Sequence, residues 1–216
     1  MNGYEVDFAW ARERLVCRLV NYEMNRELLE KIPHTRFLDL AMIYFYEMEA
    51  EGENCGILVR GRHLELWGID LEQLHAVAIQ NTRARHPFQL ASISQLIERM
   101  LFGFALHDGE ETLSVIPGDP RIFVLSNREL KFGAVNICFL DIWEEVSRQT
   151  GGDFYVLPSS IHECIILPAS AWGEEKETEL QTIVREVNAG FIVPEEILGS
   201  SVYRYCAEKH ALEVAA

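Results

Sequence analysis

Four residues that could do chemistry lie together in the segment LPSSIHE, residues 157–163. Ser159 and Ser160 carry hydroxyl groups that can act as nucleophiles, His162 carries an imidazole that can act as a base, and Glu163 carries a carboxylate. A serine and a histidine within hydrogen-bond reach of each other form the core of many hydrolase sites. The same residue types are also common in turns and at surfaces that bind a ligand or a partner.

Strand spacing argues against a hydrolase in this segment. Two strand residues such as Ser160 and His162 point the same way but stand roughly 7 Å apart, beyond a direct hydrogen bond. Glu163 directly follows His162, so it projects to the opposite face and cannot orient the imidazole. Only Ser159 could come closer to His162, across a tight turn, and no GxSxG elbow or Gly-rich oxyanion segment lies nearby. We therefore expect a turn with Pro158 at its second position, a set of candidate binding residues (Ser159, Ser160, His162 and Glu163), and no catalytic residue.

Two other polar residues stand out by their positions. Asn127 ends the apolar run FVLSN and precedes RELKFGA, in which Gly133 begins a helix pattern. A glycine there can let backbone N–H groups bind an anion, but one glycine is far short of a phosphate loop, so we favour a simple helix entry. Asn127 joins the candidate binding residues because it lies at a strand end. Asp39 lies within an apolar strand pattern, where a buried carboxylate needs a partner such as Arg36.

The elements that must position these residues indicate an α+β fold. Helix patterns cover residues 25–32, 70–83, 92–103, 132–150 and 174–189, and the second begins with a capping box of Asp70 and Gln73. Strand patterns cover residues 12–23, 37–48, 55–60, 121–127, 153–157, 162–167 and 200–214. The strands at 37–48, 153–157 and 162–167 are apolar on both faces, which predicts central positions. Hairpins outnumber parallel crossovers, so we expect a mixed, mostly antiparallel sheet with helices packed on it.

The chain is long enough for one large domain or two small ones. We expect a single domain over residues 1–216. The segment 107–120 is rich in glycine, proline and acidic residues, so a break between half-domains, if there is one, falls there.

The charge of the chain limits its partners. It has 34 acidic and 19 basic residues among 216, a net charge of −15. Phosphate backbones attract cations, so we expect no direct nucleic-acid binding. The acidity either confers solubility or serves to engage a basic protein surface, as a nucleic-acid mimic would. Trp172 lies in the loop pattern ASAWGEEKE. If it is exposed, it is a candidate anchor for a protein contact.

Metal, cofactor and membrane signals are missing from the sequence. The five cysteines are odd in number and show no CxxC spacing, and HECII lacks the second histidine of a zincin because Ile166 stands there. The start of the chain is acidic, and the longest apolar window has only strand length. We therefore expect a cytoplasmic protein with free structural cysteines and with no metal, cofactor or membrane contact.

Several longer phrases resemble one bacterial family. In order, they are RLVNYEMNRELLEKIPHTRFLDLAMIYFY, LELWGIDLEQLHAVAIQNT, FVLSN with FGAV, and GGDFYVLPSSIHECIILP with IVREVNA, VPEEIL and VYRY. They are similar to the domain of unknown function 5688 over about residues 15–205, a family common in gut anaerobes and their mobile elements. The resemblance implies a cytoplasmic bacterial protein and supplies no activity. Family members carry more chain before NYE, so it also implies a shortened N-terminus.

Charge and the lack of a coherent catalytic set together favour binding over chemistry. We expect a protein-interaction or regulatory module, such as a mobile-element accessory or nucleic-acid mimic that acts on a host protein. The alternative is a small-molecule-binding enzyme or hydrolase centred on the turn at Pro158–Glu163, with the strand end at Asn127 beside it.

Overall fold

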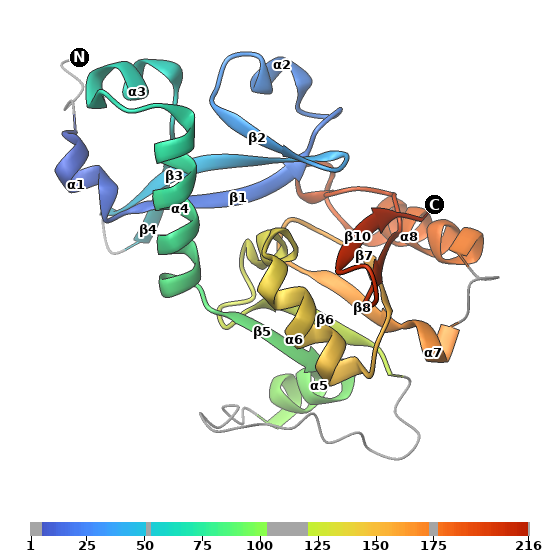
Figure 1. Cartoon of the computed structure of the whole chain (residues 1–216). Helices are drawn as coiled ribbons and strands as arrows, with labels where there is room; N and C mark the ends of the chain where they lie inside the picture. The colour runs from blue at the N-terminus through green and yellow to red at the C-terminus, as the bar shows by residue number, and fades with distance from the viewer. Residues whose placement is uncertain (1–5, 51–52, 103–120, 173–176, 216) are drawn as a thin grey trace. The chain divides into compact units, whose positions relative to one another are not determined.

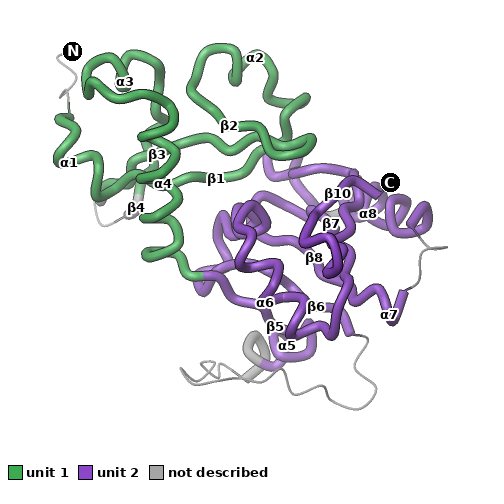
Figure 2. Tube along the Cα trace, viewed as in Figure 1, with its two compact units in different colours: residues 1–87 green, residues 88–216 purple. Residues whose placement is uncertain are grey.

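The computed structural model describes residues 6–50, 53–102, 121–172 and 177–215 (Figure 1). The chain divides into two compact units, residues 1–87 (unit 1) and 88–216 (unit 2) (Figure 2). Both units contain an antiparallel sheet with helices, which confirms the α+β fold. The segment 107–120, where the sequence placed a half-domain break, lies outside the described residues. No helix in the described ranges is both long enough and apolar enough to span a membrane.

Unit 1 is built around the long strand β3 (Leu40–Ala50). Strand β1 (Leu15–Asn21) pairs with one edge of β3, while β2 (His34–Phe37) and β4 (Glu53–Leu58) pair with successive stretches of the other edge. Phe45 on β3 faces both Val16 on β1 and Leu58 on β4. The first residues of β3 are almost fully buried, as the apolar pattern on both of its faces predicts.

A hairpin interrupts the strand predicted at residues 37–48. Phe37 pairs with Leu40, so Leu38 and Asp39 form a two-residue turn in which Leu38 takes a left-handed φ of 53°. Arg36 Nε donates a hydrogen bond to the Leu38 carbonyl at 3.0 Å. Asp39 is therefore a half-buried turn residue, and the prediction that it lies inside an apolar strand is wrong.

Four helices complete unit 1: α1 (Phe8–Arg12), α2 (Arg26–Leu29), α3 (Gly61–Trp67) and α4 (Leu71–Arg85). The predicted capping box at the start of α4 is confirmed, because Asp70 accepts from the Gln73 N–H at 2.8 Å and Gln73 accepts from the Asp70 N–H at 3.1 Å. Helix α4 packs on β1, where the buried Thr82 hydroxyl accepts from the Cys17 N–H at 2.9 Å.

Glu47 on β3 lies among three basic side chains of unit 1. Its carboxylate is 3.0 Å from Arg85, 3.3 Å from His86 and 3.8 Å from Arg18, and its side chain is 15% exposed. Burial alone would raise the pKa of Glu47. The hydrogen bond from His86 and the charges of His86, Arg85 and Arg18 outweigh burial, so the pKa is lowered. The cluster ties the sheet to the end of α4.

Unit 2 contains a six-stranded antiparallel sheet in the order β10-β9-β7-β8-β6-β5. Its strands are β5 (Phe88–Ser92), β6 (Phe123–Asn127), β7 (Phe154–Leu157), β8 (Cys164–Pro168), β9 (Tyr203–Cys206) and β10 (Ala211–Val214). The predicted hairpin of β7 and β8 lies at the centre of the sheet, as its apolar character implies. Strand β5, which pairs with β6 at an edge, has no counterpart in the sequence predictions.

The helical segments of unit 2 are α5 (Ile93–Phe102), η1 (Gly133–Cys138), α6 (Leu140–Thr150), α7 (Ala169–Trp172), α8 (Glu177–Phe191) and η3 (Pro194–Glu196). The helix predicted at 132–150 is thus divided at Phe139, which is extended. Residues two apart on a helix point about 200° apart, so one continuous helix would expose either Ile137 or Phe139. The break buries both. Helix α6 ends at Thr150, as the pattern over residues 132–150 predicts, and Gly151 follows with a left-handed φ of 87°.

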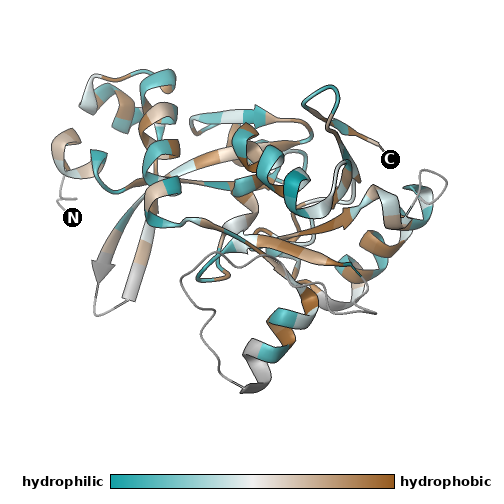
Figure 3. Ribbon diagram, turned by 60° about the horizontal axis from the view of Figure 1, so that its bottom comes forward, coloured by the Kyte–Doolittle hydropathy of each residue, from teal (hydrophilic) through white to brown (hydrophobic). Residues whose placement is uncertain are grey.

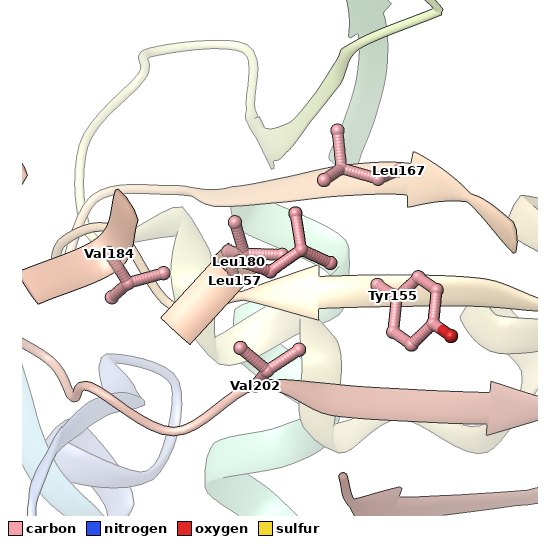
Figure 4. Packing of buried hydrophobic residues seen from close by; sticks show 6 residues of the cluster. All are labelled: Tyr155, Leu157, Leu167, Leu180, Val184 and Val202. Carbon is pink, nitrogen blue, oxygen red and sulfur yellow. The ribbon is translucent and has the colours of Figure 1, made fainter. Parts of the chain in front are cut away.

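The core of unit 2 forms where α8 packs against the central strands. Its buried members come from β7, β8, α8 and the segment before β9, and they are Tyr155, Leu157, Leu167, Leu180, Val184 and Val202 (Figure 4). Hydrophobic residues dominate the central strands, whereas the helices alternate between hydrophobic and hydrophilic residues (Figure 3). Strands β7 and β8 and helix α8 also provide residues of the candidate site described below.

Candidate functional site

The segment between β7 and β8 is a six-residue loop, Pro158–Glu163, and not the tight turn expected. His162 and Glu163 lie before the first residue of β8 and are loop residues. The loop pairs instead with the segment around η3, because Ser160 forms a β-bridge with Ile197 and the Ile161 N–H donates to the Glu196 carbonyl at 2.9 Å. The distances expected from strand alternation therefore do not apply, and the loop must be judged by its own hydrogen bonds.

Ser160 closes the loop on itself. Its hydroxyl donates to Glu163 Oε1 at 2.9 Å and accepts from the His162 N–H at 3.1 Å. Its backbone N–H donates to the Glu163 carbonyl at 3.2 Å, and the residue is only 2% exposed. A buried hydroxyl with both a donor and an acceptor partner is a structural group. The proton of Ser160 is directed at Glu163 and away from any imidazole.

His162 is held by three segments of unit 2. Its Nδ1 accepts from the Phe132 N–H at 3.1 Å, so the neutral ring carries its proton on Nε2, which lies 3.3 Å from Glu196 Oε1. The carbonyl of His162 accepts from the Ser126 hydroxyl at 2.7 Å and from the Gly133 N–H at 2.9 Å. A general base needs an unprotonated nitrogen that faces its substrate. Here that nitrogen faces a backbone N–H, and Glu196 rather than Glu163 orients the ring.

Asn127 stabilises the neighbouring turn. Its amide donates to the Lys131 carbonyl at 2.7 Å and accepts from the Lys131 N–H at 3.1 Å, and the residue is 2% exposed. Gly133 follows in η1 and packs so closely that a Cβ there would lie 2.4 Å from Asn127 N and from Ser126 Oγ. This close approach explains the glycine and supports the helix-entry interpretation. The structure therefore brings the turn of Asn127 against the loop of His162, through Ser126, Phe132 and Gly133.

Ser159 differs from the other loop residues because it lines a cavity. The cavity has a volume of about 270 Å³ and lies between the sheet and α8. Its walls include Leu157, Ile165 and Leu167 from the hairpin and Leu180, Val184 and Val187 from α8. Trp172, which the sequence predicts in a loop, instead ends the short helix α7, is half-buried and lines the same cavity.

Asn188 is the polar residue of this cavity that the sequence reasoning missed. It lies on α8, is 8% exposed, and donates from Nδ2 to the Gly199 carbonyl at 2.8 Å. Its Oδ1 is buried and has no hydrogen-bond partner among the described residues. The sequence did hold a signal, because Asn188 continues the apolar stripe of Leu180, Val184 and Val187 by the next helical step.

Two of the cysteine thiols, Cys17 and Cys164, are buried. Burial, aided by the charge of Glu163, raises the pKa of Cys164 well above its ordinary value. Burial also raises the pKa of Cys17 to about 12, although a hydrogen bond with Thr82 opposes it. A protonated, buried thiol behaves as a small apolar side chain. In the described ranges, no group of three or more histidine, cysteine, aspartate or glutamate side chains is placed to hold a metal ion.

Comparison with known proteins agrees with the long phrases of the sequence. A family model described as a family of unknown function, DUF5688, matches residues 3–207 of the 216. The chain belongs to this family. No curated protein and no solved structure matches it. Membership in DUF5688 confirms the resemblance, and the family description names no activity from which a site could be transferred.

The acidic residues of this DUF5688 protein are unequally divided between its units. Residues 88–216 carry 20 acidic and 9 basic side chains, a net charge of −11, which leaves −4 for residues 1–87. One acidic area, called here the α6 surface, consists of the exposed Leu140, Asp141 and Glu144 on α6 and the exposed Glu208 and Glu213 on the adjoining β9–β10 hairpin. The hairpin touches α6 through His210, whose Nδ1 lies 3.4 Å from Glu144.

Proposed function

We propose that this protein acts by binding, and that unit 2 engages a basic surface of a partner protein through the α6 surface. The observation that carries the proposal is the side chain of Leu140, which is 66% exposed at the start of α6 beside two exposed carboxylates. An apolar side chain supplies contact area that is desolvated on binding, and surrounding charges steer a partner of opposite sign toward it.

The charges around the α6 surface support this assignment. Arg148 on α6 lies 2.6 Å from Glu145, and Lys209 on the hairpin lies 3.7 Å from Glu213, so each of these cations has a carboxylate beside it. The net charge of −11 on unit 2 favours a negative field over this surface. A host protein that binds nucleic acid has a basic surface, which matches this negative charge. A regulatory or accessory protein can bind such a host protein by imitating a nucleic acid.

The hydrogen bonds of the loop also favour binding over catalysis. The candidate side chains form hydrogen bonds with neighbouring protein groups, and this holds for Ser160, His162, Glu163 and Asn127. A nucleophile and base that are committed in this way have to break those bonds before they can react.

The test compares two double charge reversals in the full chain. D141K/E144K changes the α6 surface, and E179K/E186K makes the same charge change on exposed positions of α8. Immobilised wild-type protein is expected to retain a basic partner from a bacterial lysate at low salt and to release it as salt rises. The α6 variant should lose roughly three- to tenfold in affinity for that partner, while the α8 variant keeps it. Equal losses in both variants, or binding that does not respond to salt, would refute the proposal.

A second candidate function is the binding of a small molecule in unit 2. It is favoured by one observation, the cavity that Ser159 lines.

A further inference from the structure

We infer that strand β4 of unit 1 is the interface of a homodimer, in which β4 pairs antiparallel with β4 of a second copy of the chain about a two-fold axis at Gly56. Pairing of this kind joins the two sheets across their edges through backbone hydrogen bonds. The interface belongs to unit 1 and is separate from the α6 surface of unit 2, so either can fail without the other.

The outer edge of β4 presents backbone donors and acceptors to a further strand. The Val59 N–H donates to the Tyr44 carbonyl at 2.9 Å, which shows where β4 bonds to β3. Bonded and non-bonded pairs alternate along an antiparallel ladder, so the N–H and C=O groups of Gly56 and Leu58 point away from β3. Within the described ranges, no strand other than β3 pairs with β4. The outward groups of Gly56 and Leu58 are therefore placed to accept a second strand.

The edge of the same sheet on the other side of β3 is closed by side chains. On β1, the Cys17 N–H donates to the Thr82 hydroxyl at 2.9 Å, and the Leu15 carbonyl accepts from Asn81 Nδ2 at 2.9 Å. Helix α4 thus occupies the positions that a further strand would need at this part of β1. Exposed edge strands commonly carry charges or proline that prevent pairing, but residues 55–58 of β4, CGIL, contain neither.

The strand is complementary to itself about Gly56. With Gly56 opposite Gly56, each Cys55 stands opposite Ile57 of the second copy. Both side chains are exposed, Ile57 by 37%, so the pairing covers each with an apolar counterpart. The other face at the axis holds Arg18, whose Nη2 would lie 2.7 Å from a Cβ at Gly56. Arg18 lies 3.8 Å from Glu47, so a carboxylate is present in each copy to offset its charge.

The small size of the contact sets its strength. Four residues of each copy, 55–58, form the pair, which places it among weak interfaces, and we expect a dimer dissociation constant of about 10–100 μM. Each copy has a net charge of −15, so salt screens the repulsion between them and should strengthen the dimer. Binding at the α6 surface should instead weaken as salt rises, which separates the two interactions.

The first test is the self-association of the full chain, measured by sedimentation velocity from about 1 to 300 μM protein. Ile57→Lys places a charge on the edge and should raise the dimer dissociation constant at least about tenfold. Val214→Lys makes the same change at a 52% exposed position on the edge strand β10 and should leave the constant unchanged. A wild type that stays monomeric, including one that binds another protein through β4 instead, overturns the inference, as does equal weakening by both variants.

The second test is a disulfide that forms only in the inferred register. Residue 55 and residue 57 of the second copy are a non-hydrogen-bonded pair with Cα atoms about 4.5 Å apart, which suits a disulfide. The two Cys55 residues are diagonal neighbours about 7–8 Å apart, which is too far. Ile57→Cys should therefore give a disulfide-linked dimer on mild oxidation, whereas the wild type and Ile57→Cys/Cys55→Ser should not. No link in Ile57→Cys, or an equal link in either control, overturns the pairing about Gly56.

Discussion

The loop at Pro158–Glu163 and the cavity beneath α8 are neighbours in unit 2, but the hydrogen bonding of their polar groups differs. In the loop, the side chains of Ser160, His162 and Glu163 are paired with each other or with nearby backbone. Beside the cavity, the amide oxygen of Asn188 is buried without a partner in the described structure. A dense set of reactive residue types can thus be a structural device.

Glu47 in unit 1 is paired with neighbouring groups, as the polar side chains of the loop are. It is a buried carboxylate with three basic neighbours, and its lowered pKa shows that these neighbours outweigh its burial. Its charge serves to hold β3, β1 and the end of α4 together. Variants that disturb the paired groups should therefore cost stability.

The largest effect is expected at the contact beneath the loop. Gly133→Ala places a Cβ 2.4 Å from Asn127 N, so the turn and the loop must move apart, and we expect a loss of about 3 kcal/mol in the free energy of unfolding. Urea denaturation followed by circular dichroism measures it. Gly61→Ala is the control, since a Cβ there meets nothing within 4 Å. Similar stability of the two variants would show that the contact at Gly133 is not tight.

Glu47→Gln extends the comparison to unit 1. Removal of the charge leaves Arg18, Arg85 and His86 without their shared counter-ion, so we expect a loss of about 2 kcal/mol near neutral pH. Glu23→Gln removes an exposed pair with Arg26 and should cost less than about 0.5 kcal/mol.

The lowered pKa of Glu47 also predicts how the stability of this variant depends on pH. The pKa of Glu47 is lower in the folded state than the ordinary value of 4.5, so its contribution to stability is present above that value. It is lost as the pH falls through the folded-state pKa. The gap in unfolding free energy between wild type and Glu47→Gln should therefore close as the pH falls below about 4.5 and through the folded-state pKa. A gap that stays as large below pH 4.5 as above it would contradict this account of Glu47.

Ser160→Ala tests the loop itself. The change removes one donated and one accepted hydrogen bond from a side chain that is 2% exposed, so we expect a loss of about 1–2 kcal/mol. The adjacent Ser159→Ala changes a residue that lines the cavity and should cost no more than about 0.5 kcal/mol. The reverse order in urea denaturation would mean that the two serines have been assigned the wrong roles.

The smallest effect on stability is expected at Asn188. Asn188→Leu loses the hydrogen bond to Gly199 but also removes a buried carbonyl that has no partner in the described structure, and these changes oppose each other. We expect the unfolding free energy to stay within about 1 kcal/mol of wild type. A loss as large as that of Gly133→Ala would place Asn188 among the structural residues.

Much of the fold follows from patterns along the chain. The capping box at Asp70 and Gln73, the central hairpin and the end of α6 at residue 150 were all predicted, because each depends on neighbouring residues. The turn at Leu38–Asp39 was missed because a left-handed leucine gives no sequence signal. The break at Phe139 was missed because burial of Ile137 and Phe139 is decided by tertiary packing, which overrides helical periodicity.

The candidate site was less accessible to sequence reasoning. The sequence placed Asn127 and His162 at strand ends, but their partners come from Lys131, Phe132 and Glu196, which only the fold brings near. The sequence did not single out Asn188 within the helix predicted at 174–189, and its buried oxygen depends on where Gly199 lies.

The most direct test of the contrast between loop and cavity is the free energy of unfolding of Ser160→Ala and Ser159→Ala, measured side by side. The account predicts a loss of about 1–2 kcal/mol for Ser160→Ala, whose side chain makes two hydrogen bonds within the loop, and of no more than about 0.5 kcal/mol for Ser159→Ala, whose residue lines the cavity. Equal losses in the two variants would contradict it.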